Sequence, residues 1–297
     1  MAVLAPRVVF VTRESEYEVL IARHATKAQA RFFLETRDQS IAAVEAAHDR
    51  FHDVLAAARM AVPDDWRQVL VRRDDLNRVL FAPTDIICAV GQDGLIANVA
   101  KYLGGQQVLG INPDPASYDG ILVRLDVDRL AKVLPACVAE DVRIEARTMV
   151  QARLDNGERL LALNEVFVGH RSHQSARYRI EAGEKSEVQS SSGLIVASGT
   201  GATGWGRSIA DATDLQLDLH PEERSVGFWV REPFPSVTTG TNMRSGKLAG
   251  EGLSVISRMN DGGTIFADGI EQDFIEFGWG REVVLGPADQ TLNLVLD

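Results

Sequence analysis

The stretch Asp85-Ile-Ile-Cys-Ala-Val90, which runs directly into Gly91-Gln92-Asp93-Gly94, decides the fold of the first half of the chain. The apolar run is typical of a buried strand, a helix is expected at 95–103, and a second apolar run follows at 107–111. Strands that alternate with helices in this way predict a parallel sheet flanked by helices. Because ligands bind beyond the carboxyl ends of such strands, the Gly91–Gly94 turn and Asn112 fall where a binding site is expected.

The segments before this stretch extend the same alternation. We expect a strand at 7–12, a helix from Ser40 to about Met60, a strand at 68–71 and a short helix at about 74–80. Residues 1–143 are therefore predicted to form a Rossmann-like α/β domain.

After about Ile144 the pattern changes to short alternating stretches that turn residues separate. Such a pattern predicts a β-rich, sandwich-like second domain over residues 144–297, whose last segment can return to the first domain. The expected strands are 145–152, 159–163, 166–168, 176–180, 194–197, 226–230, 253–257, 264–267 and 292–296.

The composition limits the classes of partner. The chain has 297 residues, 45% of them hydrophobic, and a formal net charge of -11. A surface of that sign repels phosphate backbones and anionic headgroups, so we expect neither a nucleic acid nor a membrane partner. No apolar run approaches the roughly 20 residues that cross a bilayer. The N-terminus lacks the features of a signal peptide and the two cysteines show no pattern, so the protein is predicted to be cytoplasmic.

Asp93 is the first candidate for chemistry. Backbone amides at a helix start favour an anion such as a phosphate. An aspartate placed there can accept a proton from an attacking hydroxyl or help to hold a metal ion. The alternative is an ordinary helix cap, because Asp is a good N-cap residue and Gly a good turn residue. The residues alone leave both interpretations open.

Two polar pairs of the second half are further candidates. Asn164 and Glu165 combine donor and acceptor groups that suit ribose hydroxyls and a base edge, although a surface strand is the plainer interpretation. Asp268, in the pair Asp268-Gly269, either faces a site or shapes a turn, and the turn is the more usual role.

The loop Gly193–Gly206 is rich in glycine and threonine and follows an apolar strand. Its small residues allow a ligand to approach the backbone. Thr200 and Thr203 supply hydroxyls, and Trp205 supplies a stacking face. A tight loop between two strands is the alternative interpretation.

Three glycines of this loop, Gly199, Gly201 and Gly204, match the dinucleotide fingerprint G-x-G-x-x-G. The match alone would allow an NAD-dependent oxidoreductase. The fingerprint usually opens a parallel strand–helix–strand unit, however, whereas the surroundings here are predicted to be β-rich, so this alternative is disfavoured.

The six histidines show no metal-ligand spacing. His48 and His52 lie four residues apart on the expected helix, but the H-E-x-x-H partner set is absent, so we expect them to be surface residues. No residue is therefore predicted to be a metal ligand.

Taken in chain order, these segments resemble the motifs of the NAD kinase family. That family carries a Gly-Gly-Asp-Gly turn, then Gly-Ile-Asn, then Asn-Glu, then a Gly-Leu strand before a Thr- and Gly-rich loop, and finally Asp-Gly. The matching segments are Gly91-Gln92-Asp93-Gly94, Gly110-Ile111-Asn112, Asn164-Glu165, Gly193–Trp205 and Asp268-Gly269. Stretches such as Leu163–Gly169 and Val230-Arg-Glu-Pro233 look most like the mitochondrial-type branch of the family.

The resemblance implies the two-domain fold of the NAD kinases and diacylglycerol kinases. It also implies transfer of a phosphoryl group from ATP to the adenosine-ribose 2′-hydroxyl of NAD, with a divalent cation such as Mg²⁺ at the phosphates. Asp93 would be the general base, and a homodimer or homotetramer is expected. The implied ligand contacts are Gly91 and Gly94 for phosphates, Asn164 and Glu165 for ribose and base, Thr203 and Trp205 for adenine, and Asn112, Thr200, Gly204 and Asp268 in the same site.

Three residues depart from the family pattern. Gln92 replaces the second glycine of the turn, Leu95 replaces a threonine and Trp205 replaces a tyrosine. A side chain at 92 restricts the backbone and the approach of a phosphate, and the loss of a threonine removes a hydroxyl. These departures leave two alternatives: a non-catalytic NAD(P)-binding or sensing protein on the same fold, and a kinase of another small hydroxyl acceptor.

Overall fold

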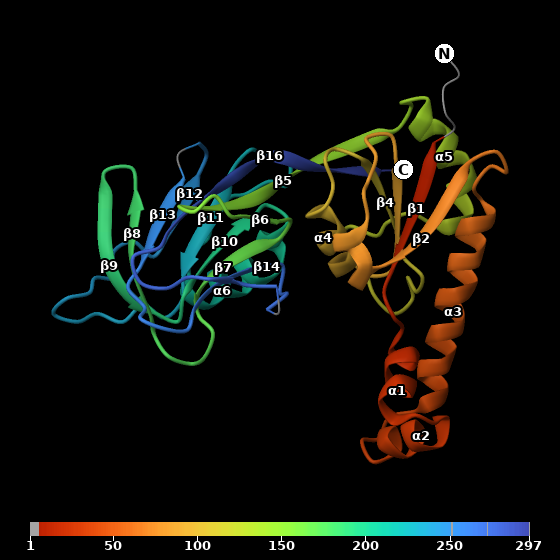
Figure 1. The fold of residues 1–297 in the computed structure, drawn as a ribbon, viewed down its shortest axis with the longest axis horizontal. Coiled ribbons are helices and arrows are strands. Elements are labelled where there is room, and N and C mark those ends of the chain that lie inside the picture. The colour runs from red at the N-terminus through yellow and green to blue at the C-terminus, as the bar shows by residue number, and fades with distance from the viewer. Residues whose placement is uncertain (1–5, 251, 272, 297) are drawn as a thin grey trace. The chain divides into compact units, whose positions relative to one another are not determined.

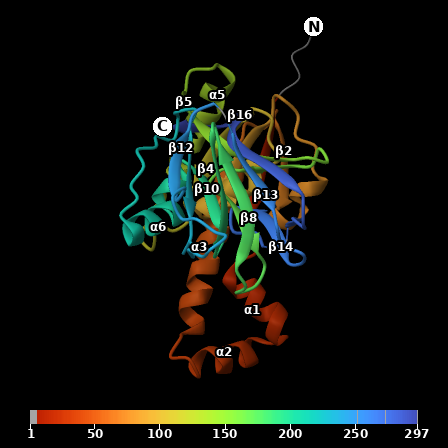
Figure 2. The same cartoon turned by 90° about the vertical axis from the view of Figure 1, so that its left-hand side faces the viewer.

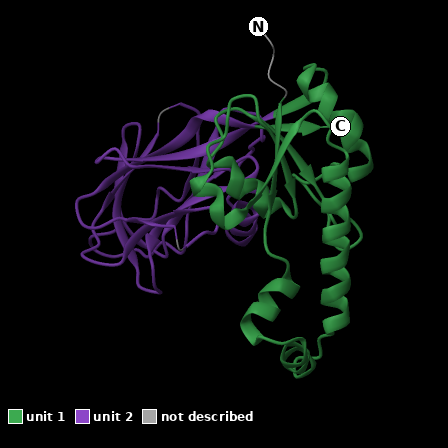
Figure 3. Cartoon of the chain, turned by 45° about the vertical axis from the view of Figure 1, so that its right-hand side comes forward, with its two compact units in different colours: residues 1–145, 293–297 green, residues 146–292 purple. Residues whose placement is uncertain are grey.

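The computed structural model describes residues 6–250, 252–271 and 273–296 (Figure 1). The chain divides into two compact units (Figure 3). Unit 1 comprises Met1–Glu145 with Asn293–Asp297, and unit 2 comprises Ala146–Leu292. Each unit has a hydrophobic core of its own.

Unit 1 is built on a parallel sheet. Strand β3 (Ile86–Val90) lies between β1 (Arg7–Thr12) and β4 (Gln107–Ile111), and β2 (Arg67–Arg72) pairs with the free side of β1. The end of β16 (Glu282–Leu296) pairs in parallel with β4 through Asn293 and Leu294. Strand β3 is buried along its whole length, which explains why its sequence is continuously apolar instead of alternating.

Helices surround this sheet and also extend from it. Leu55 and Ala58 of the long helix α3 pack into the core of the sheet. The beginning of α3 instead meets α1 and α2, which lie at the end of α3 away from the sheet (Figures 1 and 2). The helices of unit 1 are α1 (Glu16–His24), α2 (Lys27–Glu35), α3 (Ile41–Met60), η1 (Arg73–Arg78), α4 (Asp93–Ala100), η2 (Val127–Arg129) and α5 (Leu130–Val138).

Unit 2 is a sandwich of two antiparallel sheets. The first sheet has β13 (Leu253–Ser257) between β16 and β8 (Ala176–Ala182), with β9 (Lys185–Ser191) beyond β8. Strand β5 (Arg143–Leu154) pairs with β16 and with β6 (Arg159–Ala162). The second sheet has the order β12 (Ser245–Leu248), β11 (Val226–Val230), β10 (Leu194–Ser198), β7 (Glu165–His170), β14 (Gly263–Ala267), β15 (Ile275–Glu276).

The core of unit 2 lies between its sheets and includes Tyr178 of β8 with Val196 and Phe228 of the second sheet. The other face of the second sheet is covered by helix α6 (Trp205–Thr213), which follows the short η3 (Gly201–Thr203). This helix was not expected from the sequence, and neither were α1, α2, α5, β9, β12 or β15.

The elements on which the sequence interpretation depended are confirmed. The expected strand over 85–90 is β3, and the helix expected at 95–103 is α4, which begins earlier, at Asp93. The expected helix from Ser40 to Met60 is α3. Within the described ranges, no helix is both long enough and apolar enough to cross a membrane.

Candidate active site

Asp93 is the first residue of α4 and follows β3 at the carboxyl end of the parallel sheet. Its Oδ1 accepts hydrogen bonds from the backbone amides of Leu122 (2.9 Å) and Val123 (3.1 Å), and its Oδ2 accepts one from Ile121 (2.9 Å). The N-cap of α4 is Gln92, whose side chain makes no capping bond. The interpretation of Asp93 as a helix cap is therefore wrong: its carboxylate holds the loop 121–123.

The same loop explains Gly110 in the Gly-Ile-Asn segment. A Cβ atom at Gly110 would lie 2.2 Å from the carbonyl oxygen of Leu122. The amide of Leu125 donates to the carbonyl of Gly110 at 2.9 Å, so the loop runs directly against β4. Gly110 is needed because two backbones meet there, and this contact places the loop within reach of Asp93.

Asn112 follows β4 and shapes the next loop. Its Oδ1 accepts from the amide of Asp114 (2.9 Å), and its Nδ2 donates to the carbonyl of Tyr118 (3.0 Å). Asp114 also accepts a hydrogen bond from Arg50 of α3 at 2.7 Å. A pocket of about 560 Å³ borders this loop, and its lining includes Asn112, Tyr118 and Val54. Contact of Asn112 with a ligand stays a prediction.

Arg13, which was not among the predicted site residues, places a cation beside the Asp93 turn. Arg13 follows β1, and its Nη2 donates to the Oε1 of Gln92 at 2.8 Å. Burial and the charge of Asp114 raise the pKa of Tyr118, as does Asp93, while Arg13 lowers it, so these groups lie within electrostatic reach of one another. The signal for Arg13 was its place directly after a buried strand, where parallel sheets bind ligands.

Gln92 and Leu95, the two residues of this turn that depart from the family pattern, are accommodated in different ways. Gln92 has an ordinary extended backbone (φ -100°, ψ 166°), so this position does not need a glycine for its conformation. Leu95 is 2% exposed and packs inside the unit. A Cβ atom at Gly94 would meet nothing within 4 Å, so the side of the turn at Gly94 is open to a ligand.

In unit 2, Asp268 organises the Asn164-Glu165 segment. Its Oδ1 accepts from the amides of Asn164 (2.7 Å) and Glu165 (3.4 Å), and its Oδ2 accepts from the amide of Leu163 (3.1 Å). Asp268 has a positive φ of 50°. Within the described ranges, the side-chain amide of Asn164 makes no hydrogen bond. Asp268 is therefore a positioning residue for Asn164, and its own contact with a ligand stays a prediction.

The glycine-rich loop packs against the same segment. A Cβ atom at Gly201 would lie 2.1 Å from the carbonyl oxygen of Asn164. The hydroxyl of Ser198 donates to the carbonyl of Leu163 and accepts from the amides of Thr200 (3.1 Å) and Gly201 (3.2 Å). Ser198 thus joins the two segments; it was not among the predicted site residues, although it directly precedes the Gly-Thr-Gly turn.

The other residues predicted in this loop differ in their exposure to solvent. Thr200 is buried, and its hydroxyl accepts from the guanidinium of Arg147 at 3.1 Å, so it stabilises the loop. Thr203 and Gly204 are exposed, and the hydroxyl of Thr203 donates to the carbonyl of Thr200 at 2.8 Å.

Trp205 begins helix α6 and is half-buried. Its ring stacks on that of Phe167, with centroids 6.0 Å apart and planes 16° from parallel. The guanidinium of Arg231 lies 5.2 Å from the centre of the Trp205 ring. The arrangement offers the face of a fixed indole and a nearby cation to a planar or anionic ligand.

The topology excludes a Rossmann unit around the G-x-G-x-x-G match. Strand β10 precedes the glycines and β11 follows α6, but these two strands pair antiparallel, Leu194 with Val230. The fingerprint requires parallel strands around its helix. The oxidoreductase alternative therefore loses its basis, even though a helix does follow the loop.

Metal-ligating side chains do not gather at Asp93. Among the described residues, the group of three that could hold an ion is Glu18, His48 and His52, on α1 and α3. The described residues around Asp93 thus do not form a group of this kind. The cysteines offer no thiolate, because burial raises the pKa of Cys137 to about 11 and that of Cys88 higher still.

Comparison with known sequences finds NAD kinases. No family model matches the chain. The chain is 37% identical over 145 residues to an NAD kinase of Heliobacterium modesticaldum, which covers 46% of this chain and 50% of the relative. It is 28% identical over 129 residues to an NAD kinase of Geobacter metallireducens, covering 41% and 44%. The chain thus spans about half the length of the curated relatives it matches.

Solved structures are similar over nearly the whole chain. A yeast NADH kinase in complex with NADH superposes with a TM-score of 0.59 at 16% identity, covering 99% of this chain and 84% of the yeast chain. An NAD kinase from Archaeoglobus fulgidus in complex with ATP gives 0.60 at 18% identity, covering 98% and 93%. The fold is that of the NAD kinases. The predicted fold class, an α/β unit followed by a β-sandwich, is therefore confirmed.

Proposed function

We propose that this chain is an NAD kinase, which transfers a phosphoryl group from ATP to the adenosine-ribose 2′-hydroxyl of NAD and so forms NADP. The observation that carries the proposal is the carboxylate of Asp93, held by three backbone amides at the carboxyl end of the parallel sheet. The sequence relatives named NAD kinase support the proposal, as does the NAD kinase fold.

Asp93 is proposed as the general base. A carboxylate offers roughly four acceptor positions, and the three hydrogen bonds from backbone amides leave one of them for the ribose hydroxyl. The three bonds also fix the direction in which that position points, as a base in phosphoryl transfer requires. The proton of the hydroxyl passes to Asp93 as the ribose oxygen attacks the terminal phosphorus of ATP, and ADP departs with the electrons of the broken bond.

The phosphates are proposed to lie at Gly91 and Gly94. The amides at the start of α4 favour an anion, and no neighbouring atom obstructs the approach to Gly94. Arg13, which Gln92 anchors at 2.8 Å, supplies local positive charge that offsets the net charge of -11 at this turn. Mg²⁺ would bind through the phosphates with Asp93 nearby, and when bound it would offset the charge of the transferred group.

The adenosine part of NAD is proposed to bind residues of unit 2. The free side-chain amide of Asn164 suits a ribose hydroxyl, and Glu165 beside it offers a carboxylate. Trp205 and Thr203 are proposed to contact the adenine. Thr200, Gly204 and Asp268 complete the proposed set, with Thr200 and Asp268 acting through the hydrogen bonds that hold the loop and the Asn164 segment.

Finer features of the proposal follow from the family resemblance. We place the chain nearest the mitochondrial-type branch, because that resemblance includes the segment Val230–Pro233, whose Arg231 lies over Trp205. We also propose a cytoplasmic enzyme that forms a homodimer or homotetramer. Gln92 gives little support to the non-catalytic alternative, because its side chain anchors Arg13 beside the turn and the backbone of Gln92 is unstrained.

One assay tests the proposal. The purified chain is mixed with NAD, ATP and Mg²⁺, and NADP is measured with an NADP-specific dehydrogenase. We expect turnover, and we expect Asp93→Asn to lower it by about a hundred- to ten-thousand-fold, the contribution typical of a general base. Asp65→Asn, an exposed carboxylate outside the site, serves as the matched control.

The possible outcomes separate the alternatives. NAD binding by calorimetry without turnover for any phosphoryl donor would support a binding or sensing protein. Turnover of another hydroxyl compound but not of NAD would support a different kinase. Turnover that Asp93→Asn leaves unchanged would remove Asp93 as the base.

A further inference from the structure

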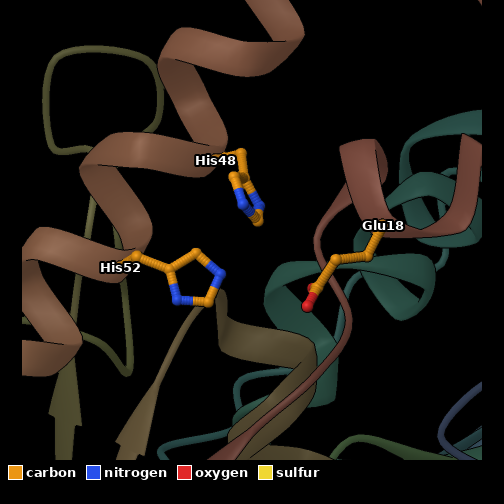
Figure 4. Close-up of side chains that lie close together, drawn as sticks. All are labelled: Glu18, His48 and His52. Carbon is orange, nitrogen blue, oxygen red and sulfur yellow. The ribbon is translucent and has the colours of Figure 1, made fainter. Parts of the chain in front are cut away.

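Three metal-ligating side chains meet on the helical extension of unit 1. Glu18 lies in the first turn of α1, and His48 and His52 lie one turn apart on α3. One ligand atom from each lies within 4.8 Å of the others. Figure 4 shows the three side chains facing a common space between the two helices. The sequence showed the histidine spacing but not Glu18, because Glu18 lies 30 positions before His48 and only the fold of α1 against α3 joins them.

The spacing is close to that of a tetrahedral metal site. Zinc binds imidazole nitrogen at about 2.0–2.1 Å and carboxylate oxygen at about 2.0–2.2 Å, so ligand atoms in such a site lie about 3.4 Å apart. The ring centres of His48 and His52 are 4.3 Å apart. Binding an ion would bring the three ligand atoms from within 4.8 Å of one another to about 3.4 Å.

The surroundings already orient these side chains as metal ligands are usually oriented. The Oγ of Ser15 lies 2.7 Å from the Nδ1 of His48 and also accepts from the amide of Glu18 at 3.2 Å. If His48 donates from Nδ1, its Nε2 carries the lone pair that binds an ion, which is the arrangement common around metal-bound histidines. The amide of Ser15 donates to the Oε2 of Glu18 at 2.7 Å and leaves Oε1 available.

The helical extension also has reason to need a cross-link. The core between α1, α2 and the start of α3 consists of four buried residues, Leu20, Ala30, Leu34 and Ile41, with a few partly buried neighbours. So small a core contributes little stability, so a disulfide or a bound metal here would stabilise the extension. Both cysteines of the chain are buried elsewhere and free, so a disulfide does not supply it.

We infer that Glu18, His48 and His52 bind a divalent transition-metal ion of the zinc class, which cross-links α1 to α3. Two imidazoles and one carboxylate suit Zn²⁺, with water in the fourth position. They do not suit Mg²⁺, which prefers oxygen ligands only, so this site is distinct from the cation proposed at the phosphates. The inference does not depend on the proposed kinase activity.

The site lies on the part of α3 that reaches the Asn112 loop. Arg50, between the two histidines in sequence, donates to Asp114 at 2.7 Å, and the amide of Asp114 donates to Asn112. An ion that fixes α3 against α1 would therefore also fix the helix segment that holds this loop. Its role is structural, because none of its ligands is among the residues proposed to meet NAD or ATP.

The test is metal binding by the full chain. After removal of metals with a chelator, Zn²⁺ is titrated by calorimetry and by competition with a chromophoric chelator. We expect one Zn²⁺ per chain and a rise in Tm on binding. Co²⁺ in place of Zn²⁺ should give the visible absorption bands of a tetrahedral ion. Excess Mg²⁺ should not displace either ion.

Variants decide whether these three residues are the ligands. Glu18→Gln and His52→Ala should each lower the Zn²⁺ affinity at least tenfold. The double variant His48→Ala, His52→Ala should show no rise in Tm when Zn²⁺ is added. His173→Ala, an exposed histidine of unit 2, is the matched control and should bind as the wild type does. Circular dichroism checks that each variant is folded. Wild-type affinity in Glu18→Gln and His52→Ala, or no stoichiometric binding by the folded wild type, would overturn the inference.

Discussion

The carboxylate of Asp268 accepts a hydrogen bond from the backbone amide of Asn164 at 2.7 Å, at the centre of three successive amides that it binds. Asp93 does the same in the other unit, where its carboxylate accepts from three successive amides of the loop 121–123. Each aspartate precedes a glycine and follows a buried strand. Both Asp-Gly pairs thus use a carboxylate to position a neighbouring backbone, whatever else Asp93 does in chemistry.

Removing the Asp268 carboxylate should disorder the Asn164 segment. We expect Asp268→Ala to lower the free energy of unfolding by about 1–3 kcal/mol, because buried amides lose their acceptors. The position has a φ of 50°, which alanine tolerates poorly and asparagine tolerates well. Asp268→Asn is therefore the matched variant: it keeps the backbone conformation and one acceptor oxygen, and it should lose less stability.

Chemical denaturation measures both variants, and calorimetry with NAD measures binding. We expect the NAD affinity to fall in the same order as the stability, with Asp268→Ala lower than Asp268→Asn. Equal affinity in Asp268→Ala and the wild type would show that the position of Asn164 does not matter for NAD.

Gly94 and Gly110 should respond differently to alanine, although both lie in family motifs. A Cβ atom at Gly94 meets nothing within 4 Å, and Gly94 lies in helix α4, so Gly94→Ala should leave stability unchanged or raise it by up to about 1 kcal/mol. A Cβ atom at Gly110 meets the carbonyl oxygen of Leu122 at 2.2 Å, so Gly110→Ala should cost about 1–3 kcal/mol.

Gly94→Ala should lower activity even though it does not lower stability. We expect Gly94→Ala to lower kcat/KM at least tenfold while the protein stays fully folded, because the added methyl group occupies the space proposed for a phosphate. If Gly94→Ala keeps wild-type kcat/KM, the phosphates do not approach the turn on that side.

The sequence predicted the parts of the fold that depend on local pattern. The apolar run before Gly91 indicated a strand fully buried in a parallel sheet, and β3 is such a strand. The helices α1 and α2 escaped prediction because each has only 9 residues, against 20 in α3, and Leu20 and Leu34 are buried by the packing of α1, α2 and the start of α3 together. Local pattern carries no information about such a partner.

The candidate site was predictable in its residues but not in their contacts. Motif order identified Asp93 and Asn164, yet nothing in the sequence indicated that Asp93 binds the amides of 121–123 or that Asp268 binds those of 163–165. Arg13 lies outside the motifs, and Ser198 lies within the segment Gly193–Trp205 without being singled out there; both come close to the sites through strand order and loop packing. These are long-range contacts, which a one-dimensional pattern does not encode.

The Asp114 and Arg50 pair should make stability depend on acid pH. The hydrogen bond from Arg50, with a second from Ser117, lowers the pKa of Asp114 below its ordinary value, although burial partly opposes the shift. A lowered pKa in the folded state means that the stabilisation is present above the ordinary carboxyl range and is lost as the pH falls through the folded value.

Asp114→Asn measures this contribution. At neutral pH we expect the free energy of unfolding of the variant to be about 0.2–1 kcal/mol lower than that of the wild type, the range of partly exposed ion pairs. We expect this difference to vanish in strong acid. Asp141→Asn, at an exposed position, should show no such pH-dependent difference. A deficit in Asp114→Asn that stays constant from neutral to acid pH would mean that the charge of Asp114 contributes nothing.

Trp205 offers a direct optical test of where the adenine binds. Its indole stacks on Phe167 and lies near Arg231, so an adenine that joins this group should change the indole fluorescence. We expect NAD to quench part of the fluorescence of the wild type. Trp205→Phe keeps an aromatic ring against Phe167 and should lose that change, with an NAD affinity lowered about three- to tenfold, as smaller stacking surfaces give. Trp279→Phe is the matched control, because Trp279 is 59% exposed and lies against Arg258 instead. Persistence of the NAD-dependent quench in Trp205→Phe, together with its loss in Trp279→Phe, would place the adenine away from Trp205.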